Sequence, residues 1–212
     1  MNTWRYLVIE GNIGAGKTSL ATALSKELNI NLVLESFSNN PFLPDFYQNP
    51  DQYAFPLELS FLAERYQQLK NLLSQPDLFR PSFVADYSIL KSLIFAQINL
   101  KDTEYQLFSK LFHIMNESLP QPDYIFYLYS ERERLQQNIR KRGREYEQQM
   151  KDEYLLSIQS GYFESLKKME HIPIVVFNVT QADFVHNQEH YSQIVKYIHE
   201  PPSPGMHFVN VG

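Results

Sequence analysis

The apolar positions near the start of the chain follow two different patterns. Residues 4–10 form a largely continuous apolar run centred on Leu7, Val8 and Ile9, whereas residues 18–28 carry apolar side chains at helical spacing. A continuous run is typical of a strand buried on both faces, and the helical spacing is typical of an amphipathic helix. The pattern therefore predicts a strand, a short turn and a helix.

The same two patterns recur along the rest of the chain. Further strands are predicted at residues 31–34, 82–86, 124–129 and 172–178, and helices at 51–73, 88–100, 104–119, 131–142, 148–170 and 188–199. Strands that alternate with helices pair in parallel, because each connection is long enough for a crossover. The predicted fold class is α/β, with a five-stranded parallel sheet, helices on both faces and a small arginine-rich lid.

The chain shows one domain and two segments without a clear pattern. We predict a single domain over residues 1–200 and a tail over residues 201–212, since no repeat or linker divides the sequence. The tail contains three prolines and is expected either to be poorly ordered or to pack on a neighbouring molecule. Residues 36–50 are rich in Asn and Pro and are predicted to form a long functional loop.

Composition excludes several classes of protein. The 212 residues include no cysteine, and 19 basic against 24 acidic side chains give a formal net charge of −5. Disulfide scaffolds and cysteine-based zinc or redox sites are therefore excluded, and the acidic balance argues against a nucleic-acid binder. No apolar run approaches the ~18 residues of a membrane span, and the N-terminus lacks the order of a signal peptide. We expect a cytoplasmic protein that binds neither nucleic acid nor membrane.

A glycine-rich loop separates the first strand from the first helix. It consists of Gly11, Asn12, Ile13, Gly14, Ala15, Gly16, Lys17 and Thr18. The loop matches G-x-x-x-x-G-K-[ST], in which backbone N–H groups and a helix N-terminus hold phosphates. Lys17 adds a full positive charge, and Thr18 offers a hydroxyl to Mg²⁺. A chance glycine turn is the alternative, but pattern and position together favour a site for ATP and Mg²⁺.

Two carboxylates follow predicted strands. Asp86 ends the strand at 82–86, where a second Mg²⁺ ligand beside the acceptor is expected, although it could also cap the following helix. Glu35 follows the strand at 31–34, at the sheet edge where open α/β folds bind ligands. It could accept a proton from an attacking hydroxyl, or it could be a surface or capping glutamate. The N-K-x-D and D-x-x-G motifs of GTPase switches are absent, which favours a kinase.

Six of the 19 basic residues lie within thirteen positions. They are Arg132, Arg134, Arg140, Lys141, Arg142 and Arg144. Guanidinium groups that close over a triphosphate would stabilise the charge of a transferring phosphoryl group. A solvated helix face is the alternative, which we accept for Arg132 and Arg134. For Arg142 and Arg144, with Gly143 between them, we favour a catalytic lid.

These features resemble the deoxynucleoside kinase family, most closely its bacterial branch of deoxyguanosine and deoxyadenosine kinases. The resemblance covers most of the chain and includes GNIGAGKTSLA, Glu35, the segments 40–43 and 45–47, FPLE at 55–58 with Arg65-Tyr66, ADY at 85–87, and RGR at 142–144 with Glu147. It implies a homodimer controlled by deoxynucleoside triphosphates.

The resemblance also assigns roles to single residues. It implies that Glu35 is the base at the nucleoside 5′-hydroxyl and that Tyr47 and Glu147 hold the sugar 3′-hydroxyl. By the same resemblance, Asp183 and Phe184 border the adenine of ATP. The catalytic groups would then be Glu35, Lys17 and the two lid arginines.

One position departs from the family pattern. Many relatives carry Arg-Ser after the acidic residue at the end of the third strand, whereas this chain reads Asp86-Tyr87-Ser88. The arginine that would reach toward the 5′ position is therefore missing. Lys91, Arg65 or a lid arginine must replace it, and the sequence leaves these alternatives open.

A predicted helix face offers a way to read a purine base. Glu58 and Arg65 share that face with Phe55, because they are separated by helical offsets. Glu58 could accept the N1–H and N2–H₂ donors of guanine while Arg65 faces O6 and N7. Adenine would lose about 1–3 kcal/mol per mismatched pair. A plain surface ion pair is the alternative for Glu58 and Arg65. Candidates to sandwich the base are Phe42, Phe55 and Phe83.

The sequence therefore predicts a kinase that moves the γ-phosphoryl group of Mg·ATP to the 5′-hydroxyl of a purine deoxynucleoside, deoxyguanosine first and deoxyadenosine second. A nucleoside monophosphate kinase of the thymidylate type is one alternative, but it needs an arginine for the acceptor phosphate where the chain has Tyr87. A non-catalytic nucleotide-dependent interaction module is the other, and in it Glu35 would be dispensable.

Overall fold

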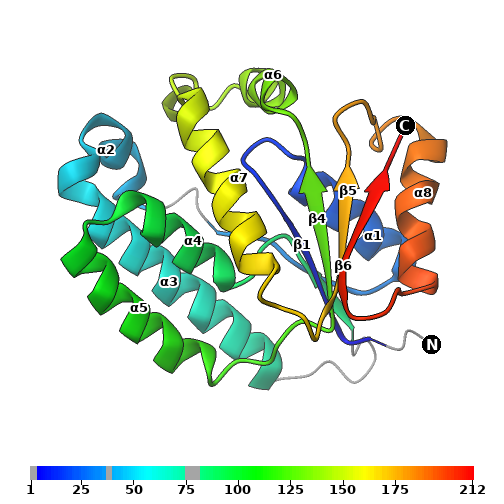
Figure 1. Cartoon of the computed structure of the whole chain (residues 1–212), viewed down its shortest axis with the longest axis horizontal. Coiled ribbons are helices and arrows are strands. Elements are labelled where there is room, and N and C mark those ends of the chain that lie inside the picture. The colour runs from blue at the N-terminus through cyan, green and yellow to red at the C-terminus, as the bar shows by residue number, and fades with distance from the viewer. Residues whose placement is uncertain (1–3, 37–39, 75–81) are drawn as a thin grey trace.

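The computed structural model describes residues 4–36, 40–74 and 82–212. Within these ranges a single parallel sheet has the strand order β2-β3-β1-β4-β5-β6. The strands are β1 (Tyr6–Gly11), β2 (Asn31–Val33), β3 (Phe83–Ala85), β4 (Tyr124–Tyr129), β5 (Pro173–Asn178) and β6 (Gly205–Asn210). The helices are α1 (Lys17–Leu28), α2 (Leu43–Gln48), α3 (Pro50–Ser74), α4 (Leu90–Asn99), α5 (Asp102–Asn116), α6 (Arg132–Arg142), α7 (Asp152–Leu166) and α8 (Gln188–His199), with a 3₁₀ turn η1 (Glu145–Glu147). Figure 1 shows this arrangement.

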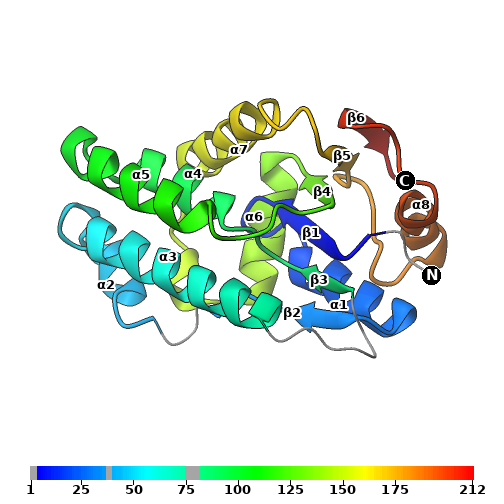
Figure 2. The same cartoon turned by 90° about the horizontal axis from the view of Figure 1, so that it is seen from below.

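Both faces of the sheet are buried, as the α/β prediction requires. Alternate residues of β1 point to opposite faces: Leu7 and Ile9 pack in a core cluster with α1 and α8, while Tyr6 and Val8 pack in a second cluster with α3, α4, α5 and α7. Figure 2 shows α3, α4 and α5 on one side of the sheet and α1 and α8 on the other. The predicted parallel sheet with helices on both faces is confirmed.

The carboxyl ends of three neighbouring strands supply the polar residues that the sequence singled out. β1 lies between β3 and β4, and its end leads into the glycine-rich loop. β2 and β3 pair in register at Val33 and Ala85, so Glu35 and Asp86 leave the sheet at the same edge. A ligand site is expected at such an edge, where the strand order changes direction.

A short helix replaces part of the loop predicted for residues 36–50, of which 37–39 lie outside the described residues. Helix α2 covers Leu43–Gln48, and Pro44 falls in its first turn, where no backbone N–H is needed. Phe46 is buried against Leu57 and Phe61 of α3. The helix depends on this tertiary contact, and six residues are too few for a pattern to reveal it.

The predicted tail contains the sixth strand, so the prediction of five strands is wrong by one. β6 pairs with β5 along its whole length, from Pro173 opposite Gly205 to Asn178 opposite Asn210. It is an edge strand with a partly exposed surface, and Phe208 is 69% exposed. The preceding prolines and the lack of a buried apolar run concealed it in the sequence. No helix in the described ranges has the length and apolar character needed to cross a membrane.

Candidate active site

The glycine-rich loop is held in a shape that side chains at its glycines would disturb. Gly14 and Gly16 have φ angles of +83° and +94°, in the left-handed region that favours glycine. A Cβ atom on Gly14 would lie 2.8 Å from the carbonyl oxygen of Leu135, and one on Gly16 would lie 2.8 Å from the ring of Phe184. The loop therefore needs glycine at both positions to turn its N–H groups toward a phosphate.

Two asparagines tie this loop to neighbouring helices. Asn12 donates from Nδ2 to the carbonyl oxygen of Leu155 at 2.7 Å, and Asn138 of α6 donates to the carbonyl oxygen of Gly14 at 2.8 Å. Sequence reasoning missed Asn138, which lies 124 positions from the loop it supports. These bonds prearrange the loop, so phosphate binding does not have to order it.

The side chain of Lys17 folds back over the start of the glycine-rich loop. Its ammonium donates to the carbonyl oxygens of Gly11 and Asn12, both at 2.9 Å. Burial, together with the nearby ammonium of Lys91, lowers the pKa of Lys17 to about 8. A negatively charged phosphate next to Lys17 would counteract both effects.

Thr18 and Asp86 form a pair of oxygen ligands beside the loop. Thr18 Oγ1 donates to Asp86 Oδ2 at 2.5 Å, and the other oxygen of Asp86 accepts from the backbone N–H of Glu35 at 2.8 Å. A hydroxyl and one carboxylate suit Mg²⁺, which completes its shell with water and phosphate oxygens. In the described part of the chain, no group of three or more His, Cys, Asp or Glu residues could form a closed metal cage. The site therefore fits Mg²⁺ that arrives with a nucleotide.

Asp86 is accordingly not the cap of the next helix. The N-cap of α4, Ile89, has no side-chain cap bond, and Ser88 just before it is held by the buried Glu10, whose Oε1 accepts from the backbone N–H and the hydroxyl of Ser88, at 2.8 and 2.6 Å. Tyr162 of α7 donates to the second oxygen of Glu10 at 2.8 Å. Glu10 thereby fixes the start of α4 against β1 and α7.

Glu35 is held by two cations at the centre of the site. Arg65 donates to Glu35 Oε1 from Nε at 2.9 Å and from Nη2 at 2.6 Å, and Lys91 donates to Oε2 at 2.5 Å. Burial opposes ionisation of Glu35, but Lys91 and Arg65 outweigh it and hold the pKa of this carboxyl well below its ordinary value. The alternative of a surface or capping glutamate is wrong, since the side chain is only 10% exposed.

The arginine-rich segment bends back over the site after α6. Gly143 ends the helix with φ +73°, and the next residues form η1. Arg142 and Arg144 both form ion pairs with the buried Glu147, the second at 3.2 Å. Arg132, in contrast, pairs on the surface with Glu133 and Asp152. Arg142 and Arg144 therefore differ from Arg132 in that their carboxylate partner is buried.

Arg134 differs from the surface position expected for it. Its guanidinium donates to the carbonyl oxygen of Ala182 at 3.3 Å and lines a cavity above the glycine-rich loop. This contact ties α6 to the loop after β5, where Asp183 and Phe184 border the same cavity.

Two cavities meet at the carboxyl edge of the sheet. The larger, of about 670 Å³, is lined by the glycine-rich loop, α6 and residues 182–186. The smaller, of about 110 Å³, contains Glu35 and Asp86. Four side chains line both cavities: Lys17, Thr18, Arg142 and Arg144. A phosphate chain in the larger cavity would thus end beside Glu35 in the smaller one.

The smaller cavity contains most of the predicted acceptor residues. Tyr47, Arg65 and Glu147 line it together with Glu35 and Asp86. Sequence reasoning missed Phe61, Phe95 and Tyr146, which also line it. The ring of Tyr146 stacks on Tyr47 at 5.5 Å, and Phe61 lies under the Arg65 guanidinium at 5.0 Å. The helical offset between Phe61 and Arg65 is a signal that could have identified Phe61.

The expected base-reading residues are only partly brought to this cavity. Phe55 and Glu58 are described but are not among the residues that line it, and Phe42 packs on the cluster around Phe46. Phe83 stacks on Tyr6 in the core at 4.5 Å, so its predicted place beside a base is wrong. Phe83 is the first residue of β3 and lies opposite Tyr6, the first residue of β1, so it is at the amino end of the sheet, away from the site.

Glu58 and Arg65 are both buried, but they do not form the expected pair. The donors of Arg65 go to Glu35 and, at 2.6 Å, to the hydroxyl of Ser92. Glu58 Oε1 accepts from Asn99 at 2.7 Å, while its Oε2 is buried without a partner. Burial raises the pKa of Glu58 to about 7. The surface-pair alternative is therefore also wrong.

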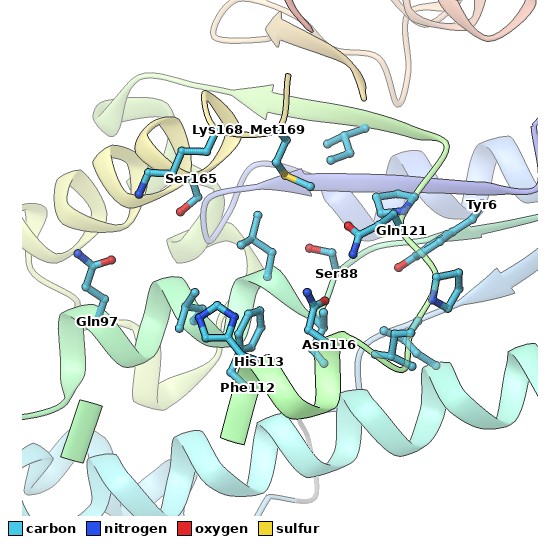
Figure 3. A pocket seen from close by; sticks show the side chains of 18 of the residues that line it. Tyr6, Ser88, Gln97, Phe112, His113, Asn116, Gln121, Ser165, Lys168 and Met169 are labelled. Atoms are coloured by element: carbon cyan, nitrogen blue, oxygen red, sulfur yellow. The ribbon is translucent and has the colours of Figure 1, made fainter. Parts of the chain in front are cut away.

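A third cavity shares none of its described lining residues with the first two. Figure 3 shows its lining, which includes Tyr6, Ser88 and Gln121. Its volume is about 490 Å³, and Tyr6 and Ile125 place it near the amino ends of β1 and β4, opposite the glycine-rich loop. No Asp, Glu or Arg is among its described lining residues. This cavity lacks the groups needed for phosphate transfer.

Known proteins resemble the chain in both sequence and fold. A family model described as deoxynucleoside kinase matches residues 7–201. The deoxyguanosine kinase of Bacillus subtilis (strain 168) is 33% identical over 204 residues, which cover 94% of this chain and 99% of that one. The deoxyadenosine kinase of Dictyostelium discoideum is 32% identical over 211 residues, covering 97% of this chain and 82% of that one.

Solved structures show the likeness of the fold. The structure of deoxyadenosine kinase from M. mycoides with bound dATP superimposes with a TM-score of 0.79 at 21% identity, over 92% of this chain and 99% of that one. The same kinase with the products dCMP and dCDP gives a TM-score of 0.80 at 24% identity, with the same coverage.

Proposed function

We propose that the chain, which belongs to the deoxynucleoside kinase family, transfers the γ-phosphoryl group of Mg·ATP to the 5′-hydroxyl of a purine deoxynucleoside, with deoxyguanosine preferred over deoxyadenosine. The observation that carries the proposal is the junction of the two cavities. Lys17, Thr18, Arg142 and Arg144 line both, and Glu35 lies just beyond them in the smaller cavity. Family membership argues against both a thymidylate-type kinase and a non-catalytic module.

The larger cavity suits the donor nucleotide. The loop N–H groups and Lys17 would hold the phosphates, and Phe184, which packs over Gly16, would border the adenine together with Asp183. Thr18 and Asp86 would hold Mg²⁺, which neutralises charge on the phosphate oxygens when bound.

The smaller cavity suits the sugar of the acceptor. Tyr47 and Glu147 would bind the 3′-hydroxyl, and Glu147 is already bonded to Arg142 and Arg144. Sugar binding would therefore help to place the lid arginines over the phosphoryl group. Glu35 would orient the 5′-hydroxyl and accept its proton late, so that its position matters more than its basicity in a loose transition state.

The purine preference rests on Glu58. Its unpartnered Oε2 could accept the N1–H and N2–H₂ donors of guanine, while Asn99 holds Oε1. Arg65 lines the smaller cavity and so belongs to the nucleoside site, where its main role is to hold Glu35 and not to contact the base. Phe42 and Phe55 remain candidates for base contact.

A panel of the four deoxynucleosides with Mg·ATP tests the proposal, with the 5′-monophosphate as the measured product. We expect the highest kcat/KM for deoxyguanosine and the next for deoxyadenosine. A pyrimidine at the top of the panel would contradict the base assignment, and no product from any of the four would contradict the reaction.

Assembly and location are further parts of this proposal. The family resemblance supports a homodimer controlled by deoxynucleoside triphosphates, and the composition supports a cytoplasmic protein. Sedimentation equilibrium at micromolar concentration should give twice the mass of the chain, and a monomer would contradict the dimer.

A further inference from the structure

We propose that Lys91 is a catalytic residue that contacts the attacking 5′-oxygen and the transferring phosphoryl group. The proposal rests on the proposed function, since it assumes that Glu35 orients the 5′-hydroxyl. It resolves the question of which cation serves the 5′ position, where Tyr87 offers none. Tyr87 is fully buried and donates to Gln68 at 2.6 Å, and it is not among the residues that line the acceptor cavity.

The two oxygens of Glu35 differ in how many hydrogen bonds they can still accept. A carboxylate oxygen has two lone pairs. Oε1 already accepts two bonds from Arg65, at 2.9 and 2.6 Å, whereas Oε2 accepts one bond, from Lys91 at 2.5 Å. A hydroxyl that binds Glu35 without displacing either cation must therefore use Oε2. That geometry places the hydroxyl oxygen next to the ammonium of Lys91.

Lys91 also has donors to spare for this purpose. An ammonium group carries three N–H donors, and the bond to Glu35 uses one of them. The side chain is 10% exposed and otherwise lies over the ring of Phe95 at 5.4 Å. A buried ammonium with unused donors favours an anion in the cavity that it lines, where a phosphoryl group would complete its bonds.

The other candidate cations already bind other groups of the protein. Arg65 is used on Glu35 Oε1 and on Ser92. Arg142 and Arg144 are bound to Glu147, which lines the same cavity. Lys17 belongs to the donor loop, but it lies close enough to Lys91 for the two charges to affect each other. A phosphoryl group passing between the cavities would lie between Lys17 and Lys91.

The experiment compares Lys91→Gln, which removes the charge, with Lys91→Arg, which keeps it. We expect Lys91→Gln to lower kcat by at least about 100-fold while the KM for the deoxynucleoside changes less than about threefold. Lys91→Arg should recover at least about a tenth of the lost activity. Lys110→Gln, at an exposed position of α5, is the matched control and should leave both constants unchanged.

A second comparison separates contact with the phosphoryl group from support of Glu35 alone. In a Glu35→Gln background, Lys91→Gln should lower kcat by a further factor of about ten or more, with both proteins shown to be folded by thermal unfolding. No further loss, or a kcat of Lys91→Gln within about fivefold of the unsubstituted enzyme, would overturn the proposal. The deoxynucleoside panel uses the unsubstituted enzyme, so it tests the proposed reaction independently of the role of Lys91.

Discussion

Glu58 has two carboxylate oxygens with different surroundings, and this difference bears on the choice of base. Oε1 accepts a bond from Asn99, whereas Oε2 is buried without a partner. Burial raises the pKa of the side chain to about 7. Near neutral pH the group can therefore be an acceptor when ionised, which suits guanine, or a donor when protonated, which suits N1 of adenine.

The first prediction concerns substrate choice. If Glu58 reads the base as proposed, the ratio of kcat/KM for deoxyguanosine to that for deoxyadenosine should rise severalfold between about pH 6 and pH 8, because ionisation removes the donor that would bind N1 of adenine. Glu58→Gln should lower this ratio and abolish its pH dependence. A ratio that is the same at both pH values and in the variant would show that Glu58 does not take part in recognising the base.

The second prediction concerns stability. The folded-state pKa of Glu58 is about 7, above an unfolded value of about 4.3. Its contribution to folding is therefore complete below about pH 4 and is lost as pH rises through about 7. We expect the free energy of unfolding of the unsubstituted protein, relative to Glu58→Gln, to fall by about 2–3 kcal/mol between pH 5 and pH 8.

Urea unfolding of both proteins at the two pH values measures this difference. Glu35 does not affect this comparison between pH 5 and pH 8, because its pKa is lowered. Its contribution to the free energy of unfolding is present above about pH 4.3 and is lost only as pH falls further. Parallel pH dependence in the two proteins would show that Glu58 titrates normally.

Helices and strands whose own residues follow a clear pattern could be predicted, whereas those held mainly by tertiary contacts could not. β1, the glycine-rich loop and α1 follow from an apolar run, three glycines and helical spacing. α2 was missed because six residues are too few for a pattern and the helix is held by the packing of Phe46 on α3. β6 was missed because it is held by pairing with β5.

The same limit applies to the candidate site. Glu35 and Asp86 were identified because both follow strands, and parallel strands bring their ends together. The partner of Arg65 was predicted wrongly, since a shared helix face does not reveal that Glu35, 30 positions away, lies opposite that face. Phe83 was proposed beside a base because an aromatic side chain alone does not show that it lies at the amino end of β3, away from the site.

The third prediction concerns the lid formed by the end of α6 and η1. Arg144→Ala should lower kcat by about 100-fold or more, because the proposed role of the lid guanidinium is to stabilise charge on the transferring phosphoryl group. The Kd for the deoxynucleoside should change less than about threefold, since Arg142 still holds Glu147. Arg132→Ala, on the exposed part of α6, is the matched control. A loss confined to deoxynucleoside affinity would count against the lid.

The molecule as a whole is acidic, yet it concentrates positive charge where the two cavities join. Its formal net charge is −5. The smaller cavity nevertheless combines five basic side chains with three acidic ones. The basic side chains are Lys17, Arg65, Lys91, Arg142 and Arg144. This local excess can hold a triphosphate, while the overall charge disfavours nucleic acid.

The arrangement also explains why the chemistry falls at one edge of the sheet. β1, β2 and β3 deliver the glycine-rich loop, Glu35 and Asp86 to neighbouring positions, and α3 and α4 bring Arg65 and Lys91 to Glu35. In the proposed function, donor and acceptor bind in two cavities that share Lys17.

The most direct test of the account is the rate at which Glu35→Gln forms 5′-monophosphate from deoxyguanosine and saturating Mg·ATP. In the proposed mechanism Glu35 orients the 5′-hydroxyl and accepts its proton, so kcat should fall by at least about 100-fold while the Kd for ATP stays within about threefold. A variant that keeps more than about a tenth of kcat would contradict the placement of the hydroxyl between Glu35 and the triphosphate.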